Sequence, residues 1–165
     1  MIGRLGEGKR CVQDVTHLAF PVGITQMAQS IDPAEYGIPS NIRVLIAEDT
    51  EVSRKVLVLV FKKMGIEPQW VENGQDAVEK ALESNFDLIM MDVWMPQMNG
   101  MQATRFIRSE VKDSRPIIIG VGGDSGADDV RACLESGMDA YVVKPPQVQK
   151  LLALIGSLFG QRKPA

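Results

Sequence analysis

The sequence predicts an α/β protein in which five parallel strands form one doubly wound sheet with helices on both faces. Short apolar runs alternate five times with longer segments of helical periodicity. Connections between parallel strands are right-handed, and this handedness places the helices against the sheet. With 165 residues, 45% of them hydrophobic, the chain is long enough for one domain with its own core.

The predicted strands are apolar runs bounded by charged or turn-forming residues. They cover Ile42–Ala47, Glu67–Val71, Asp87–Met91, Ile117–Val121 and Ala140–Val143. Pro68 cannot donate a hydrogen bond to a neighbouring strand, so the second strand is expected at an edge of the sheet. The apolar run before Asp92 is typical of a strand buried on both faces.

The predicted helices begin and end at capping residues. The first has Thr50 as N-cap and Gly65 as its C-terminal cap, and its apolar positions fall on one face at Val52, Val56, Val60 and Met64. The others are expected from Gln75 to about Glu83, from Met101 to before Pro116, from a capping box at Ser125 to Ser136, and over the stripe Val148, Leu151, Leu152, Ile155 and Phe159.

Three segments are expected from the way Gly and Pro residues are distributed along the chain. Residues 1–40 are broken by Gly and Pro and are interpreted as a linker or docking arm able to lie on the domain. Residues 41–160 form the domain, and residues 161–165 a tail.

Composition excludes several classes of function. Eighteen basic against 21 acidic residues give a net charge of -3, which argues against direct nucleic-acid binding. No apolar run approaches the roughly 18 residues of a membrane span, and no secretory signal is recognisable. The two cysteines share no metal-binding or redox spacing, so a cytoplasmic protein without membrane insertion is expected.

Charged residues follow three of the predicted strands. Glu48 and Asp49 follow the first strand, Asp92 the third and Lys144 the fifth. Ligands of such sheets bind beyond the carboxyl ends of the strands. These side chains are therefore expected to meet in one pocket.

This set of side chains favours phosphoryl transfer. Carboxylates without a nearby histidine favour Mg²⁺ over zinc. A lysine suits a phosphoryl group, and an aspartate carboxylate can act as a nucleophile that forms an acyl phosphate. Because phosphoryl transfer needs mainly alignment and charge neutralisation, the predicted reaction is transfer of a phosphoryl group onto Asp92.

Three motifs resemble the signatures of response-regulator receiver domains: Leu45–Asp49, Met91–Gly100 and Tyr141–Pro145. The resemblance covers about Ile42 to Phe159 and implies the flavodoxin-like (CheY-like) fold with strand order 2-1-3-4-5. The segment Cys133–Asp139 is similar to receivers attached to hybrid histidine kinases.

The resemblance also implies a role for each residue of the pocket. Asp92 would be the phosphoacceptor, Lys144 would bind the phosphoryl oxygens, and Tyr141 would be the aromatic switch residue. The implied Mg²⁺ ligands are Glu48, Asp49, Asp92 and the backbone carbonyl of Trp94. The donor would be a histidine kinase or a histidine phosphotransfer protein, and a homodimer stays open. No turnover beyond self-phosphorylation and autodephosphorylation is implied, whether the chain is a stand-alone receiver or part of a hybrid kinase.

One position departs from the family pattern. Receivers carry Ser or Thr at the end of the fourth strand, whereas counting back from Lys144 gives Gly122 and counting forward from Pro116 gives Val121. A lost hydrogen bond to a charged group costs about 1.5–3 kcal/mol, which predicts phosphorylation with weak or altered switching. Ser125 could supply the hydroxyl if its loop folds inward, although a role as helix cap is preferred.

Alternatives remain at this stage. One is a receiver-like module that binds a partner without phosphorylation-dependent switching. An aspartate-nucleophile phosphohydrolase would need a second acid at the position of Trp94, and a nucleotide-binding loop would need a glycine at Ser125. Trp94 either shields the acyl phosphate from water or is an exposed loop aromatic.

Overall fold

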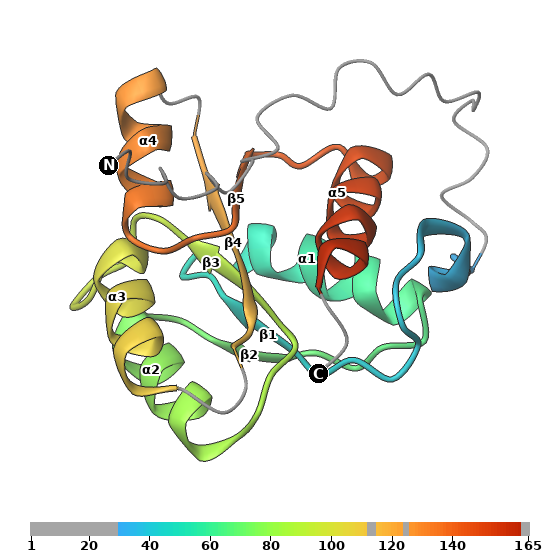
Figure 1. The fold of residues 1–165 in the computed structure, drawn as a ribbon, viewed down its shortest axis with the longest axis horizontal. Coiled ribbons are helices and arrows are strands. Elements are labelled where there is room, and N and C mark those ends of the chain that lie inside the picture. Colours follow the sequence, from blue (N-terminus) through green and yellow to red (C-terminus); the bar gives the residue numbers. More distant parts are fainter. Residues whose placement is uncertain (1–29, 112–114, 124–125, 163–165) are drawn as a thin grey trace, which may run out of the picture.

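The computed structural model describes residues 30–111, 115–123 and 126–162 as a five-stranded parallel sheet between two helical layers (Figure 1). The strands are β1 (Val44–Ala47), β2 (Gln69–Val71), β3 (Leu88–Asp92), β4 (Ile117–Gly122) and β5 (Ala140–Val143). Their order is β2-β1-β3-β4-β5, so the predicted fold class and strand order are confirmed.

Helices pack against both faces of the sheet. They are α1 (Glu51–Lys63), α2 (Gly74–Glu83), α3 (Gly100–Glu110), α4 (Ala127–Glu135) and α5 (Val148–Gln161). One apolar core lies between the sheet and α1 with α5, and the other lies between the sheet and α2, α3 and α4 (Figure 1). All residues of β1, β3 and β4 are buried, because helices cover both sides of these inner strands. As predicted, β2 is an edge strand.

Capping residues fix where helices begin, with two differences from expectation. Asn73 caps α2 by accepting a hydrogen bond from the Asp76 amide at 2.8 Å. Thr50 is the N-cap of α1, but its hydroxyl donates to Asp49 rather than capping the helix. The predicted cap of α4 was wrong, since Gly126 is the N-cap and Ser125 lies outside the described residues.

The face of α1 that packs on the sheet differs from the predicted one. Val60 is 6% exposed, whereas Val52 is 72% and Val56 is 42% exposed. Steps of four residues exceed one helical turn of 3.6 residues, so a row built from them drifts around the helix. Arg54 and Leu57 occupy the inward positions in the first half of α1 instead.

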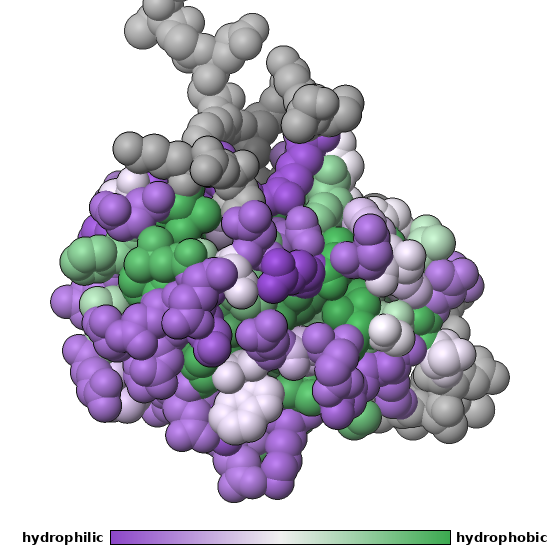
Figure 2. Space-filling view, turned by 90° about the horizontal axis from the view of Figure 1, so that it is seen from below, coloured by the Kyte–Doolittle hydropathy of each residue, from purple (hydrophilic) through white to green (hydrophobic). Residues whose placement is uncertain are grey.

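Large apolar side chains also reach the surface, some of them in a row on α1 and the others apart from one another. Figure 2 shows one face, on which polar side chains surround separate apolar patches. The large apolar side chains exposed among the described residues are Val52, Val56, Leu59, Trp70, Leu82, Trp94, Phe106 and Val143. None of the described helices combines the length and the apolar character that crossing a bilayer requires.

The described residues before β1 pack on the domain. A short 3-10 helix, η2 (Pro33–Tyr36), contacts α5, and the Ile31 amide donates to the Lys63 carbonyl at 2.9 Å. A Cβ on Gly156 would lie 1.7 Å from the Tyr36 carbonyl oxygen, so only glycine permits this approach. Residues 1–29 lie outside the described part, and the domain boundary at residue 41 stays a prediction.

Candidate functional site

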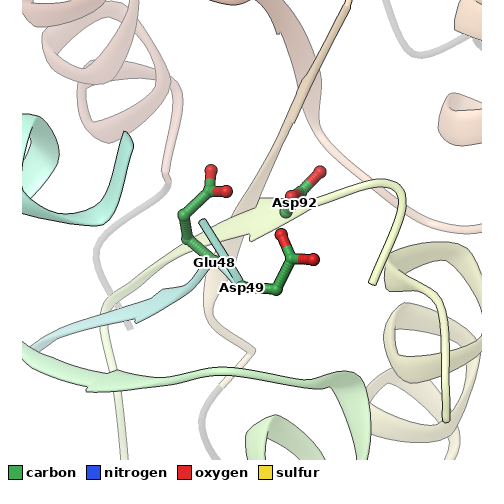
Figure 3. Close-up of side chains that lie close together, drawn as sticks. All are labelled: Glu48, Asp49 and Asp92. Atoms are coloured by element: carbon green, nitrogen blue, oxygen red, sulfur yellow. The ribbon is translucent and has the colours of Figure 1, made fainter. Parts of the chain in front are cut away.

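Three carboxylates gather where β1 and β3 end. Glu48 and Asp49 follow β1, and Asp92 is the last residue of β3 (Figure 3). The two strands are neighbours, with Ala47 opposite Met91, so residues that follow them lie side by side. Each carboxylate offers an oxygen atom, and these three atoms lie within 4.8 Å of one another. The structure thus brings the three predicted acids together.

Lys144 reaches the same place from the end of β5. Its Nζ lies 2.7 Å from Glu48 Oε2 and 2.8 Å from Asp92 Oδ2. The backbone amide of Lys144 donates to the Gly122 carbonyl at 2.6 Å, which fixes the start of its side chain at the end of β4. The ammonium therefore spans from β5 across β4 to both acids, as the strand-end argument predicted.

Burial determines the electrostatics of this cluster. Glu48 is fully buried and Asp92 is 4% exposed, while Asp49 is exposed. Burial raises the pKa of Asp92 to about 6 and the charge of Glu48 adds to this, while the hydrogen bond from Lys144 opposes it. Burial lowers the pKa of Lys144, but the hydrogen bonds and charges of Asp92 and Glu48 outweigh this and raise it overall.

The donor set fits a hard divalent cation. Among the described residues, the ammonium of Lys144 contacts two of the three carboxylates, Glu48 and Asp92. All donors of the cluster are oxygen atoms, which Mg²⁺ prefers, and the arrangement leaves one acid exposed on the solvent side. Glu48, Asp49 and Asp92 are thus suited to hold such an ion.

Trp94 lies beside the cluster in the loop after β3. Its backbone amide donates to Asp92 Oδ1 at 3.1 Å, and the residue is 61% exposed. This hydrogen bond holds the loop close to the carboxylate. The role of its carbonyl as a metal ligand stays a prediction, as does shielding of an acyl phosphate by the indole.

The residue at the end of β4 is Gly122, and Tyr141 packs over it. A Cβ on Gly122 would lie 2.4 Å from Tyr141 Oη, and one on Gly120 would lie 3.3 Å from Tyr141 Cδ2. The phenol donates to the Gly123 carbonyl at 2.7 Å. The ring therefore occupies space that a side chain at position 122 would need. Weak switching stays a prediction, and Ser125, the alternative hydroxyl, lies outside the described residues.

Arg54 is a contact of this site that the sequence did not reveal. It is 8% exposed, and its NH1 donates to the Glu48 carbonyl at 2.9 Å. Its NH2 lies 2.9 Å from Glu72 Oε1. The available signal was its spacing of three residues from Leu57, which places both on one helical face. An arginine in a surface helix is ordinarily solvated, so the pattern alone gave no reason to place it inside.

Comparisons with known proteins agree with this geometry. Residues 44–156 match the family model for the response regulator receiver domain. Hybrid signal transduction histidine kinase A of Dictyostelium discoideum is 38% identical over 107 residues, which are 62% of this chain and 5% of that protein. Response regulator ArlR of Staphylococcus aureus (strain Mu50) is 35% identical over 122 residues, 74% of this chain and 54% of that protein.

Solved receiver structures are similar as well. The receiver domain of the histidine kinase CKI1 from Arabidopsis thaliana, complexed with Mg²⁺ and BeF₃⁻, has a TM-score of 0.69 and 32% identity, covering 78% of this chain and 97% of that one. Another similar structure is the receiver domain of the response regulator Ssk1 of Saccharomyces cerevisiae, co-crystallised with the histidine phosphotransfer signaling protein Ypd1. The match has a TM-score of 0.60 and 30% identity and covers 67% of this chain and 83% of the matched one.

The family match spans more than half of the chain, and the sheet order and the strand-end cluster of acids agree with it. The chain belongs to the response regulator receiver domains of two-component signalling.

Proposed function

We propose that Asp92 accepts a phosphoryl group from a phosphohistidine donor in a reaction that requires Mg²⁺. The observation that carries this proposal is the ammonium of Lys144, 2.8 Å from Asp92 Oδ2 and 2.7 Å from Glu48 Oε2, in a cluster of three carboxylates. The side chains come from three strands that are distant in sequence, and their charges suit a cation together with a phosphoryl group.

In this reaction an Asp92 carboxylate oxygen attacks the phosphorus atom of the donor. An oxygen–phosphorus bond forms, and the phosphorus–nitrogen bond of the phosphohistidine breaks. The imidazole leaves with the electron pair, and the product on this chain is an acyl phosphate. With a pKa of about 6, Asp92 is mostly ionised at neutral pH and is able to act as the nucleophile.

The other residues neutralise charge and hold the geometry. Lys144 would exchange its contact with Asp92 for one with a phosphoryl oxygen and would keep its contact with Glu48. Glu48, Asp49, Asp92 and the Trp94 carbonyl would hold Mg²⁺, which supplies positive charge for the phosphoryl oxygens. The Trp94 amide keeps one Asp92 oxygen oriented, leaving the other for attack.

The surface next to the cluster supports a protein donor. The α1 apolar stripe consists of Val52, Val56 and Leu59, which are 72%, 42% and 56% exposed and lie one turn apart. The helix that carries it begins directly after Asp49 and Thr50. A helical donor such as a histidine phosphotransfer protein could cover this stripe while its phosphohistidine reaches Asp92.

The proposed place of action is a reducing cytoplasm, which suits the free buried thiol of Cys133.

Intact-mass measurement tests the proposal. Purified protein is mixed with acetyl phosphate and Mg²⁺, and we expect one added phosphoryl group that Asp92→Asn and chelation of Mg²⁺ both prevent. Labelling that persists in Asp92→Asn would show that another residue is the acceptor.

A second candidate function is a partner-binding module without phosphorylation-dependent switching. It is favoured by Gly122, which has no hydroxyl to bind a phosphoryl group, and by Tyr141, which packs over Gly122 and donates a hydrogen bond to the Gly123 carbonyl. Comparing ring signals of Tyr141 by NMR with and without beryllofluoride separates the two. Unchanged signals in a protein that binds beryllofluoride would favour this candidate.

A further inference from the structure

Arg54 is enclosed at the base of the acidic cluster. It is 8% exposed although it belongs to the first turns of a surface helix, and neighbouring Val52, Lys55 and Val56 are exposed. Burial of a guanidinium is unfavourable unless its donors are satisfied. Its partners therefore indicate what the residue does.

These partners are the backbone of the segment that carries the metal-binding acids. NH1 donates to the Glu48 carbonyl at 2.9 Å and lies 3.5 Å from the Asp49 carbonyl oxygen. On the other side, the Glu48 amide donates to the Val71 carbonyl of β2 at 3.1 Å. The peptide groups of Glu48 are thus held from both sides, by Arg54 and by the edge strand.

The charge of Arg54 is balanced at the same place. NH2 lies 2.9 Å from Glu72 Oε1, and the guanidinium carbon lies 4.5 Å from the centre of the Trp70 ring. An uncompensated positive charge here would oppose binding of a cation nearby. Paired with Glu72 and stacked on Trp70, the guanidinium can hold the turn with less repulsion of the ion.

We propose that Arg54 is a positioning residue for the Mg²⁺ site and sets the placement of Glu48 and Asp49 by holding their backbone carbonyls. The inference rests on the proposed Mg²⁺ site. Mg²⁺ demands nearly ideal octahedral geometry, whereas Ca²⁺ accepts flexible coordination. Loss of Arg54 therefore weakens Mg²⁺ binding more than Ca²⁺ binding.

Calorimetric titration of Mg²⁺ and of Ca²⁺ into the whole protein tests this inference. Residues that orient metal ligands affect affinity strongly, so we expect Arg54→Gln to raise the Mg²⁺ dissociation constant about tenfold and the Ca²⁺ constant by less. Arg54→Lys keeps the charge but has no planar fork, so it recovers only part of the affinity. Phosphorylation by acetyl phosphate should return to the parent rate at saturating Mg²⁺.

Lys55→Gln is the matched control for charge. Lys55 follows Arg54 in the helix, and its substitution by Gln removes the same unit of positive charge. Its side chain is 73% exposed and pairs with Glu51. Its substitution should leave both dissociation constants unchanged.

The outcomes separate the inference from the proposed function. If Arg54→Gln binds Mg²⁺ as the parent does and only melts at a lower temperature, Arg54 is purely structural and the inference is wrong. If Arg54→Gln does not fold, the same comparison is made with Arg54→Lys. The inference is then wrong if Arg54→Lys binds both Mg²⁺ and Ca²⁺ with the dissociation constants of the parent. If the parent itself binds no Mg²⁺, the proposed metal site fails.

Discussion

The ionisation of Asp92 is linked to the stability of the folded state. Its pKa is about 6 in the folded protein against an ordinary value of 3.8, chiefly because the carboxyl group is buried. The folded state thus binds this proton more tightly than the unfolded chain does. The stability that this gives is complete below pH 3.8 and is lost as the pH rises through about 6.

Asp92→Asn should therefore stabilise the protein without Mg²⁺ above pH 6. The amide carries no charge to bury. At about 1.36 kcal/mol per pKa unit, the rise from 3.8 to about 6 sets an upper limit of about 3 kcal/mol on the gain. Thermal unfolding in a chelator-containing buffer, measured between pH 4 and pH 8, checks this. The gain should disappear toward pH 4, and a variant that is less stable than the parent at neutral pH would contradict the argument.

The contact between Gly122 and Tyr141 also depends on a single residue, because it requires glycine at position 122. Gly122→Ala should displace the Tyr141 ring, because the added Cβ would lie 2.4 Å from Oη. Ring NMR signals and tyrosine absorbance measure the resulting exposure. Gly123→Ala is the matched control, since a Cβ there meets nothing within 4 Å. If the Tyr141 ring keeps its position in Gly122→Ala, the backbone of β4 must have moved to make room for the added Cβ.

At the scale of elements, α1 has two distinct faces. Its inner face carries Arg54 to the acidic cluster, and its outer face carries the α1 apolar stripe of Val52, Val56 and Leu59. Exposed apolar side chains in a row one turn apart are typical of a surface for a partner. Val52 and Val56 belong to the row that was predicted to face the sheet, but they face solvent and form part of this outer face.

Val56→Glu should slow transfer from a histidine phosphotransfer protein but not from acetyl phosphate. The new charge opposes docking on α1, while the small donor needs no docking surface. Rates are measured with a phosphorylated histidine phosphotransfer protein that phosphorylates the parent chain and with acetyl phosphate, at equal Mg²⁺. Leu82→Glu, an exposed residue of α2 across the sheet, serves as control. Equal slowing with both donors would place the defect in Asp92 chemistry.

The contact between η2 and α5 predicts a sharp difference between two glycines of one helix. Gly156→Ala should destabilise the fold by about 1–3 kcal/mol, because a Cβ would overlap the Tyr36 carbonyl. Gly160→Ala meets nothing within 4 Å and should be neutral or stabilising by up to about 1 kcal/mol. Urea unfolding of both variants measures this. Equal effects would show that η2 detaches at little cost.

At the scale of the whole molecule, the sequence allowed the fold and most of the site to be predicted. Apolar runs locate the strands, and the parallel topology brings their carboxyl ends together, so Glu48, Asp92 and Lys144 were expected to meet. Arg54 could not be found this way, because its burial depends on backbone carbonyls from another segment. The same holds for the Tyr141 ring over Gly122, which depends on side-chain direction rather than on strand order.

Mg²⁺ should stabilise the entire domain, because the carboxylates proposed to bind it meet only when β1 and β3 are paired. A ligand that binds only the folded state adds about 2.7 kcal/mol at one hundred times its dissociation constant. Melting temperatures are measured with MgCl₂ and with KCl at equal ionic strength. Glu48→Gln should reduce the shift, and a shift that is equal with both salts would indicate simple screening.

The described residues before β1 are fixed to the domain at the end of α1 that lies away from the acidic cluster. Ile31 is bonded to Lys63 at the last residue of α1, and α1 begins beside the acidic cluster. A helix of 13 residues is about 20 Å long. The point at which Ile31 is fixed is therefore about one helix length from the start of α1, next to Asp49 and Thr50.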